Sequence, residues 1–105
     1  MATAELTIIG LGGAGAAGAA PSASRYLAEV QRRLEAQDRV RWELHAMGTN
    51  LEGETADVLA LVGELHAVPF GLGLPRVYTV LKLDERRDRA QTLGDKVDAV
   101  RRALG

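Results

Sequence analysis

The stretch RVRWELHAMGTNLE, residues 39–52, occupies the middle of the chain and decides how the flanking elements can be arranged. Polar and apolar residues alternate over residues 39–47, as they do in a strand with one buried face. Gly48 and Thr49 can turn the chain, and residues 50–52 can run back as a second strand that Gly53 ends. We therefore expect a β-hairpin in the centre of the chain.

The segments on either side of this hairpin predict further strands and helices. Residues 4–9 alternate as a strand, and residues 24–37 have apolar side chains at helical spacing. Residues 54–70 predict a second helix, residues 76–84 form the clearest strand, and Thr92 can cap a last helix. The three apolar helix stripes are Tyr26, Leu27, Val30 and Leu34; Val58, Leu61, Val62, Leu65 and Val68; and Leu93, Val97, Val100 and Leu104.

This order of elements, β-α-β-β-α-β followed by a helix, predicts an α+β fold. Antiparallel strands with both crossover helices on one sheet face form a ferredoxin-like sandwich. We predict a ferredoxin-like βαββαβ sandwich with an additional C-terminal helix, as a single domain over residues 1–105. Residues 10–20 contain five glycines and five alanines and predict a loop inside this domain.

Part of this loop, Gly10 to Gly15, reads G-x-G-x-x-G, which is the spelling of a dinucleotide-binding fingerprint. In that fingerprint the glycine turn opens directly into a helix whose N-terminus holds a pyrophosphate. The first helix expected here starts only after Pro21, and the required acidic position, about 20 residues on, falls inside that helix. We therefore interpret the match as chance and the segment as a connecting loop.

The composition of the 105-residue chain excludes several classes of protein. The net charge of −1 shows neither a nucleic-acid-binding surface nor a membrane-binding one. The absence of cysteine from the sequence excludes disulfides, thiolate metal ligands and cysteine nucleophiles. The N-terminal segment lacks the basic start of a signal peptide, and no stretch approaches the roughly 20 apolar residues of a membrane span. We expect a cytoplasmic protein with no nucleic-acid or membrane partner.

One face of the predicted sheet has no helix to cover it. That face would carry Thr7, Ile9, Glu43, His45, Met47, Tyr78, Val80 and Lys82. Half of these side chains are apolar, which is too many for a face covered by water alone. A second copy of the chain is the simplest cover, so we predict a homo-oligomer built on a two-fold dimer.

The sequence contains no convincing catalytic or metal-binding set. His45 and His66 are the two histidines, whereas a metal site needs at least three converging ligands. Ser24 has no base near it in sequence, although His45 could approach it in the fold. The run from Asp84 to Arg89 is either a solvated turn with internal ion pairs or an arginine pair that holds an anion or a partner subunit. We expect no metal, no cofactor and no catalysis.

Five segments resemble the small thiamine-binding protein family, in the same order and over nearly the whole chain. They are Glu5–Ile9 with the glycine loop, Ser22–Glu29, Met47–Glu54 (M-G-T-x-apolar-E-G-E), Arg76–Asp84 with Arg86–Asp88 (R-V-Y-T-x-apolar-K-apolar-D-x-R-R-D), and Gly94–Val97. The third and fourth are long enough to be specific. The resemblance implies a ferredoxin-like fold, assembly into dimers and tetramers, and binding of thiamine or its hydroxymethylpyrimidine part at or near subunit interfaces, without catalysis.

A flat aminopyrimidine suits a slot with an aromatic or thioether wall and a few polar groups. The six candidate ligand-binding residues are Ser24, Met47, Thr49, Glu52, Tyr78 and Lys82. Met47 and Tyr78 can supply walls, and Ser24 and Thr49 can donate or accept hydrogen bonds. Glu52 can accept from the amino group or favour a thiazolium cation. Each has a structural alternative: Ser24 can cap a helix, and Met47 and Tyr78 can form a dimer core.

These observations predict a homo-oligomer that binds thiamine or hydroxymethylpyrimidine without turning it over. Two alternatives stay open. One is a structural or regulatory assembly module without a small ligand, and the other is a small enzyme with an unidentified substrate. A melting temperature that rises with thiamine separates the binding protein from the assembly module.

Overall fold

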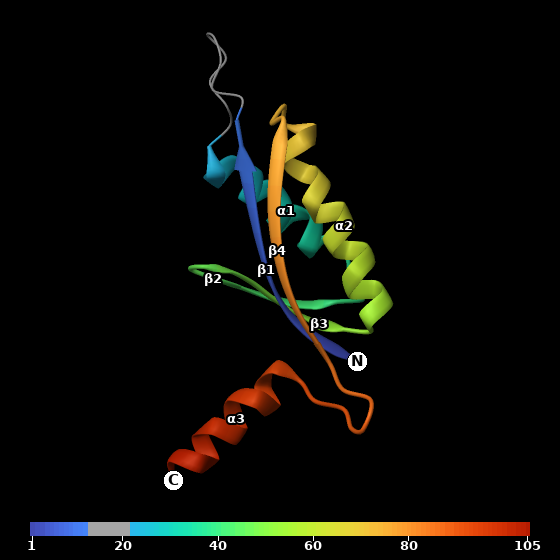
Figure 1. Ribbon diagram of the computed structural model, residues 1–105, viewed down its shortest axis with the longest axis vertical. Helices are drawn as coiled ribbons and strands as arrows, with labels where there is room; N and C mark the ends of the chain where they lie inside the picture. Colours follow the sequence, from blue (N-terminus) through green and yellow to red (C-terminus); the bar gives the residue numbers. More distant parts are fainter. Residues whose placement is uncertain (13–21) are drawn as a thin grey trace.

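The computed structural model of the protein describes residues 1–12 and 22–105. The elements in these ranges are β1 (Ala2–Leu11), α1 (Ala23–Glu35), β2 (Arg41–His45), β3 (Gly48–Gly53), α2 (Thr55–Gly71), β4 (Arg76–Glu85) and α3 (Leu93–Leu104). The strands form one antiparallel sheet in the order β2-β3-β1-β4 (Figure 1). The predicted ferredoxin-like sandwich with its additional C-terminal helix is confirmed.

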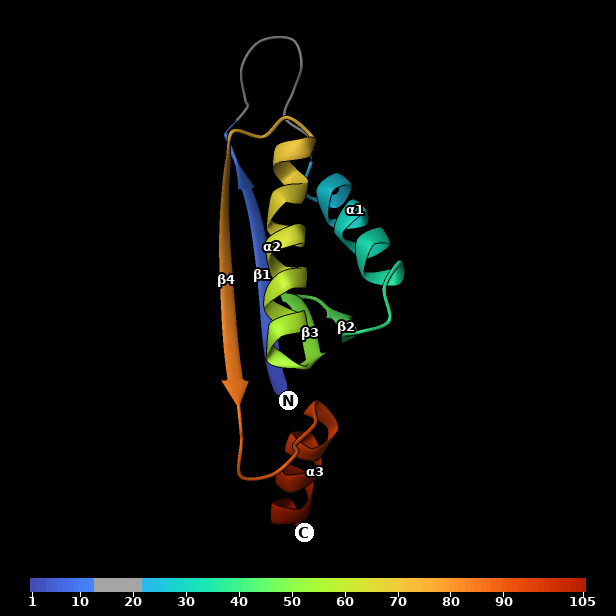
Figure 2. The ribbon, with the colours of Figure 1, turned by 90° about the vertical axis from the view of Figure 1, so that its right-hand side faces the viewer.

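Helices α1 and α2 cover one face of this sheet and form the hydrophobic core with it (Figure 2). On β1 the side chains of Ala4, Leu6 and Ile8 point into the core, because alternate strand residues share a face. The α2 stripe is buried as predicted: Val58, Leu61, Val62, Leu65 and Val68. In α1 the predicted Tyr26, Val30 and Leu34 are buried, whereas Leu27 remains 42% exposed.

Most element boundaries differ from the prediction by one or two residues; in particular, the hairpin turn falls at Ala46 and Met47, whereas Gly48 and Thr49 belong to β3. Helix α1 begins at Ala23 with Ser22 at the N-cap position, so Ser24 lies inside the first turn and does not cap the helix. Strand β2 begins at Arg41 instead of residue 39, because the Gln37 amide holds the preceding residues in a turn. Its Nε2 donates to the carbonyl oxygens of Leu34 and Val40, and its Oε1 accepts from the backbone N–H of Val40.

Gly10 belongs to β1 and not to the loop in which the sequence placed it. A Cβ at this position would lie 2.4 Å from Leu74 Cδ1 and 3.2 Å from the ring of Tyr26, whose hydroxyl accepts from the Gly10 N–H. The glycine therefore lets two core side chains close over the end of the strand. Helix α1 begins at Ala23, and most of the G-x-G-x-x-G segment, including Gly13 and Gly15, lies outside the described residues.

The sheet face opposite α1 and α2 is called the open face here. The strand register places Thr7, Ile9, Glu43, His45, Tyr78, Val80 and Lys82 on it, as predicted. Met47 follows the end of β2 and lies in the turn of the β2–β3 hairpin. Among the described residues, no helix covers most of the open face, so its apolar side chains are partly exposed to solvent.

Helix α3 begins against one end of the open face and then projects away from the sheet (Figure 1). Its first turn has the capping box that Thr92 predicted: the Thr92 hydroxyl accepts from Asp95 N, and the Asp95 carboxylate accepts from Thr92 N. No helix in the described part of the chain is long and apolar enough to cross a membrane.

Candidate functional site

A groove of about 250 Å³ lies between helix α1 and the β2–β3 hairpin. The lining residues are Leu6, Thr7, Ile8, Leu27, Val30, Leu44, His45, Ala46, Met47, Gly48 and Thr49. Leu27 and Leu44 form exposed parts of its walls, with 42% and 57% of their surface accessible. None of the lining residues is an aspartate, glutamate, lysine or arginine, so the groove suits an uncharged, largely apolar group.

The hairpin is held close to β1 at the end of the groove. A Cβ on Gly48 would lie 2.6 Å from the backbone oxygen of Leu6, so a larger residue would push β3 away from β1. The Thr7 hydroxyl donates to the Met47 carbonyl oxygen at 3.1 Å and fixes the turn from the open-face side. The glycine of the M-G-T sequence therefore has a packing role that sets the position of its neighbours.

Thr49 is the buried polar residue of this groove. It pairs with Leu6 on β1 and Leu44 on β2, which places its side chain on the helix-covered face. Only 6% of the residue is exposed, and its side chain lines the groove. A hydroxyl at this position can donate a hydrogen bond to a bound ligand or accept one from it.

His45 and Glu5 form a polar cluster on the open face, behind the groove. The backbone N–H of Met47 donates to His45 Nδ1 at 3.3 Å, which identifies this nitrogen as an acceptor and leaves a proton on Nε2 in the neutral ring. Nε2 is buried and lies 3.4 Å from Glu5 Oε2, without hydrogen-bond geometry. On the other side of Glu5, Lys82 Nζ lies 3.5 Å from Oε1.

Glu52 is buried at the opposite end of the open face, where helix α3 begins. Its Oε2 accepts from the backbone N–H of Leu93 at 2.9 Å, and its Oε1 lies 3.6 Å from Arg41 Nη1. A carboxylate at a helix N-terminus is favoured by the unpaired N–H groups and the helix dipole. The carboxylate that the sequence assigned to a ligand is therefore occupied in anchoring α3.

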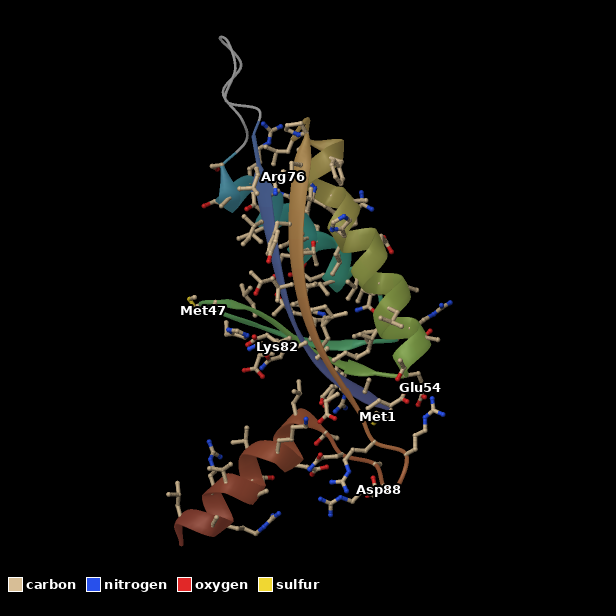
Figure 3. All side chains as sticks on the ribbon, in the orientation of Figure 1. Met1, Met47, Glu54, Arg76, Lys82 and Asp88 are labelled. Carbon is tan, nitrogen blue, oxygen red and sulfur yellow. The ribbon has the colours of Figure 1, made fainter. Side chains whose placement is uncertain are left out.

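The six predicted binding residues do not share one pocket. Met47 and Thr49 line the groove, and Met47 stands at the tip of the hairpin, 79% exposed (Figure 3). Tyr78, Lys82 and Glu52 lie on the open face, and Ser24 is exposed in the first turn of α1. Ligand contacts by all six residues stay predictions. Sequence reasoning missed the walls Leu27 and Leu44, although Leu27 is an apolar residue of the helix before the hairpin and Leu44 an apolar residue of its first strand.

The charged run after β4 forms ion pairs within itself. Arg86 Nε donates to Asp88 at 2.8 Å, and Arg87 Nε donates to Glu85 at 2.7 Å. The Arg86 hydrogen bonds lower the pKa of Asp88 to about 2. The Thr55 hydroxyl, and then Arg87, lower the pKa of Glu85. These contacts agree with a solvated turn whose charges pair locally.

The sequence matches a family of known proteins over almost its full length. A profile of the family described as thiamine-binding protein matches residues 4–101. The chain is 39% identical over 107 residues to UPF0045 protein YqgV of Bacillus subtilis, covering 99% of this chain and 98% of that one. It is 40% identical over 105 residues to a UPF0045 protein of Methanothermobacter thermautotrophicus, covering 99% and 100% of the two chains.

Solved structures agree with this assignment. Protein MJ1052 of Methanocaldococcus jannaschii superimposes with a TM-score of 0.78 at 34% identity, over 94% of each chain. A Thermotoga maritima protein provisionally assigned to thiamine biosynthesis or salvage shares the fold, with a TM-score of 0.73 at 16% identity over 94% of this chain and 97% of that one. The sequence match over residues 4–101 shows that this chain belongs to the thiamine-binding protein family.

Proposed function

We propose that this protein binds thiamine, or its hydroxymethylpyrimidine part, in the groove between α1 and the β2–β3 hairpin. The observation that carries the proposal is the largely buried Thr49, the polar residue of β3 in the wall of an apolar groove. Family membership supplies the class of ligand. The protein acts in this proposal as a homo-oligomer in the cytoplasm.

The chemistry of the groove fits a pyrimidine ring better than the rest of thiamine. An aminopyrimidine is flat and uncharged, so leucine walls can cover its faces while Thr49 exchanges a hydrogen bond with a ring nitrogen or the amino group. The volume of about 250 Å³ is just below the roughly 300–1,000 Å³ of sites for drug-sized ligands. The charged thiazolium would extend toward the exposed Met47 and solvent.

Binding without turnover is part of this proposal. General acid–base catalysis needs two suitable groups that converge on one substrate atom. The groove lining contains one titratable side chain in the described residues, His45, and its Nε2 turns toward Glu5 on the open face. This arrangement supports a carrier or sensor more than an enzyme.

Isothermal titration calorimetry with hydroxymethylpyrimidine and with thiamine tests the proposal. We expect both to bind, and Thr49→Val to weaken binding about fivefold, because a hydrogen bond is worth roughly 1 kcal/mol. Thr3→Val is the matched control, since Thr3 is a buried strand threonine on the open face, away from the groove. Absence of heat with either compound at millimolar concentration, or equal affinities of the Thr49 variant and the wild type, would contradict the proposed site.

A structural or regulatory assembly module is the second candidate function. The exposed apolar residues of the open face and of α3 favour self-association independently of any small ligand. A protein that forms oligomers but binds neither compound would support this candidate.

A further inference from the structure

Helix α3 is anchored by its first turn and exposed over the rest of its length. Leu93 N donates to Glu52, and Lys96 pairs with Asp84, whereas no residue of α3 is buried. Val97, Val100 and Leu104 are 49%, 61% and 83% exposed. At 3.6 residues per turn these three lie on the same side of the helix as Leu93. The apolar stripe therefore continues the side by which α3 touches the sheet, and beyond the first turn it is largely exposed in the described structure.

A second exposed apolar surface lies on the open face, and we name it the β1–β4 patch. It consists of Ile9, Tyr78 and Val80, which are 38%, 53% and 39% exposed. Ile9 pairs with Tyr78 across the two strands, so the patch is continuous. Among the described residues, both this patch and the α3 stripe are left partly exposed to solvent.

The α3 helix cannot reach the β1–β4 patch of its own chain. It is tied to Asp84, and Tyr78 is six residues back along β4, about 20 Å away at 3.3 Å per residue. The patch lies toward the end of β4 marked by Arg76, whereas α3 extends from the opposite end and points away from the sheet (Figure 3). Any α3 helix that covers the patch must come from another copy.

The charges beside the two surfaces are complementary. The helical spacing places Arg101 on one flank of the α3 stripe, whereas Lys96 on the other flank is already paired with Asp84 of its own chain. The row of the open face next to the patch contains Glu5, Glu43 and Lys82. Lys82 lies 3.5 Å from Glu5, and Glu43 has no ion-pair partner among the described residues. In the proposed contact, Arg101 would therefore lie near Glu43, the carboxylate of this row that has no ion-pair partner among the described residues.

We propose that α3 is an exchanged arm: in a two-fold dimer, the α3 stripe of each protomer packs on the β1–β4 patch of its partner. Both surfaces occur once in each chain, so one two-fold axis covers both patches and both helices and leaves no open end. This proposal rests on the self-association included in the proposed function, but not on ligand binding.

Equilibrium sedimentation of the full-length protein tests the role of the stripe. We expect a dimer, and Val100→Asp should raise its dissociation constant about 100-fold or more, because a charge replaces a central apolar contact. Ala99→Asp is the matched control, since residue 99 lies on the side of α3 away from the stripe, and it should leave the constant within about threefold. A wild-type monomer would overturn both the exchanged arm and the proposed self-association. A Val100→Asp dimer as tight as the wild type would overturn the exchanged arm alone.

Cysteine cross-linking tests the pairing directly, because the chain has no cysteine of its own. The variants Val100→Cys and Tyr78→Cys are prepared separately, each with an unchanged melting temperature, and are then mixed and oxidised. We expect a mixed disulfide dimer, identified by its mass. Val100→Cys mixed with Leu59→Cys, an exposed position on α2, should give none. Preferential disulfide formation between two Val100→Cys chains would show helix-to-helix pairing and overturn the proposal, as would a mixture that stays dimeric without a mixed disulfide.

Discussion

Helices α2 and α3 have similar sequence patterns and opposite environments. Each carries apolar residues at helical spacing, yet Val58 and Leu65 of α2 are completely buried while Val100 and Leu104 of α3 are 61% and 83% exposed. Helix α2 connects β3 to β4, so both of its ends are fixed to the sheet and its stripe must lie on it. Helix α3 is fixed at one end only. An apolar stripe thus predicts that a helix surface will be covered. Whether its own sheet or another surface covers it depends on how the helix is connected to the sheet.

Truncation of one leucine on each helix would test this contrast most severely. Leu65→Ala should lower the free energy of unfolding by about 2–5 kcal/mol, since it leaves a cavity in the core. Leu104→Ala removes the same atoms from an exposed side chain and should cost less than about 0.5 kcal/mol. Urea unfolding at concentrations too low for self-association gives both values. Equal losses would mean that α3 is packed against its own domain in solution.

The fold could be predicted from the sequence because local patterns and connection order constrain it. The alternation of β1 and the stripe of α2 identified the core residues. The two crossover helices pointed to the ferredoxin-like topology. The same alternation predicted which side chains lie on the open face, for example those of Ile9 and Tyr78. Local pattern did not show where α3 would project, because that depends on contacts with Glu52 and Asp84, which are distant in sequence.

The candidate site could be predicted only in part. Met47 and Thr49 line the groove because they sit together at the hairpin turn. Thr49 and Glu52 are three residues apart on β3, so strand alternation alone puts their side chains on opposite faces and excludes a shared pocket. The wall formed by Leu27 could not be predicted, because it depends on how far α1 lies from the hairpin, which long-range packing sets.

The second test removes the anchor of α3. Glu52→Ala removes the carboxylate that accepts from Leu93 N and leaves the half-buried start of α3 without this partner. We expect a loss of about 1–3 kcal/mol in the docking of α3, seen as faster hydrogen exchange at the amides of residues 93–97. The amides of α2 should not change.

Glu54→Ala is the control for this variant, because Glu54 is two residues away and its side chain is 75% exposed. It should leave the exchange of α3 as in the wild type. If Glu52→Ala left α3 equally protected, the first turn would be held by something other than this carboxylate, such as the partner copy.

The smallest effect is expected at the start of α2, which, like the start of α3, is hydrogen-bonded to a carboxylate of the sheet. The Thr55 hydroxyl donates to Glu85 at the end of β4, and it is the main reason that the pKa of Glu85 lies below the ordinary value of 4.5. A lowered pKa in the folded state means that Glu85 stabilises the fold above pH 4.5, and that this contribution is lost as the pH falls through the lowered pKa.

Thr55→Val should therefore raise the pKa of Glu85 in an NMR titration, and Arg87→Ala should raise it less, since Arg87 is the second cause. Because Glu85 can be reached by solvent, the melting temperature at neutral pH should barely move. A large fall on Thr55→Val would show instead that α2, like α3, depends on the polar contact at its start more than on its buried stripe.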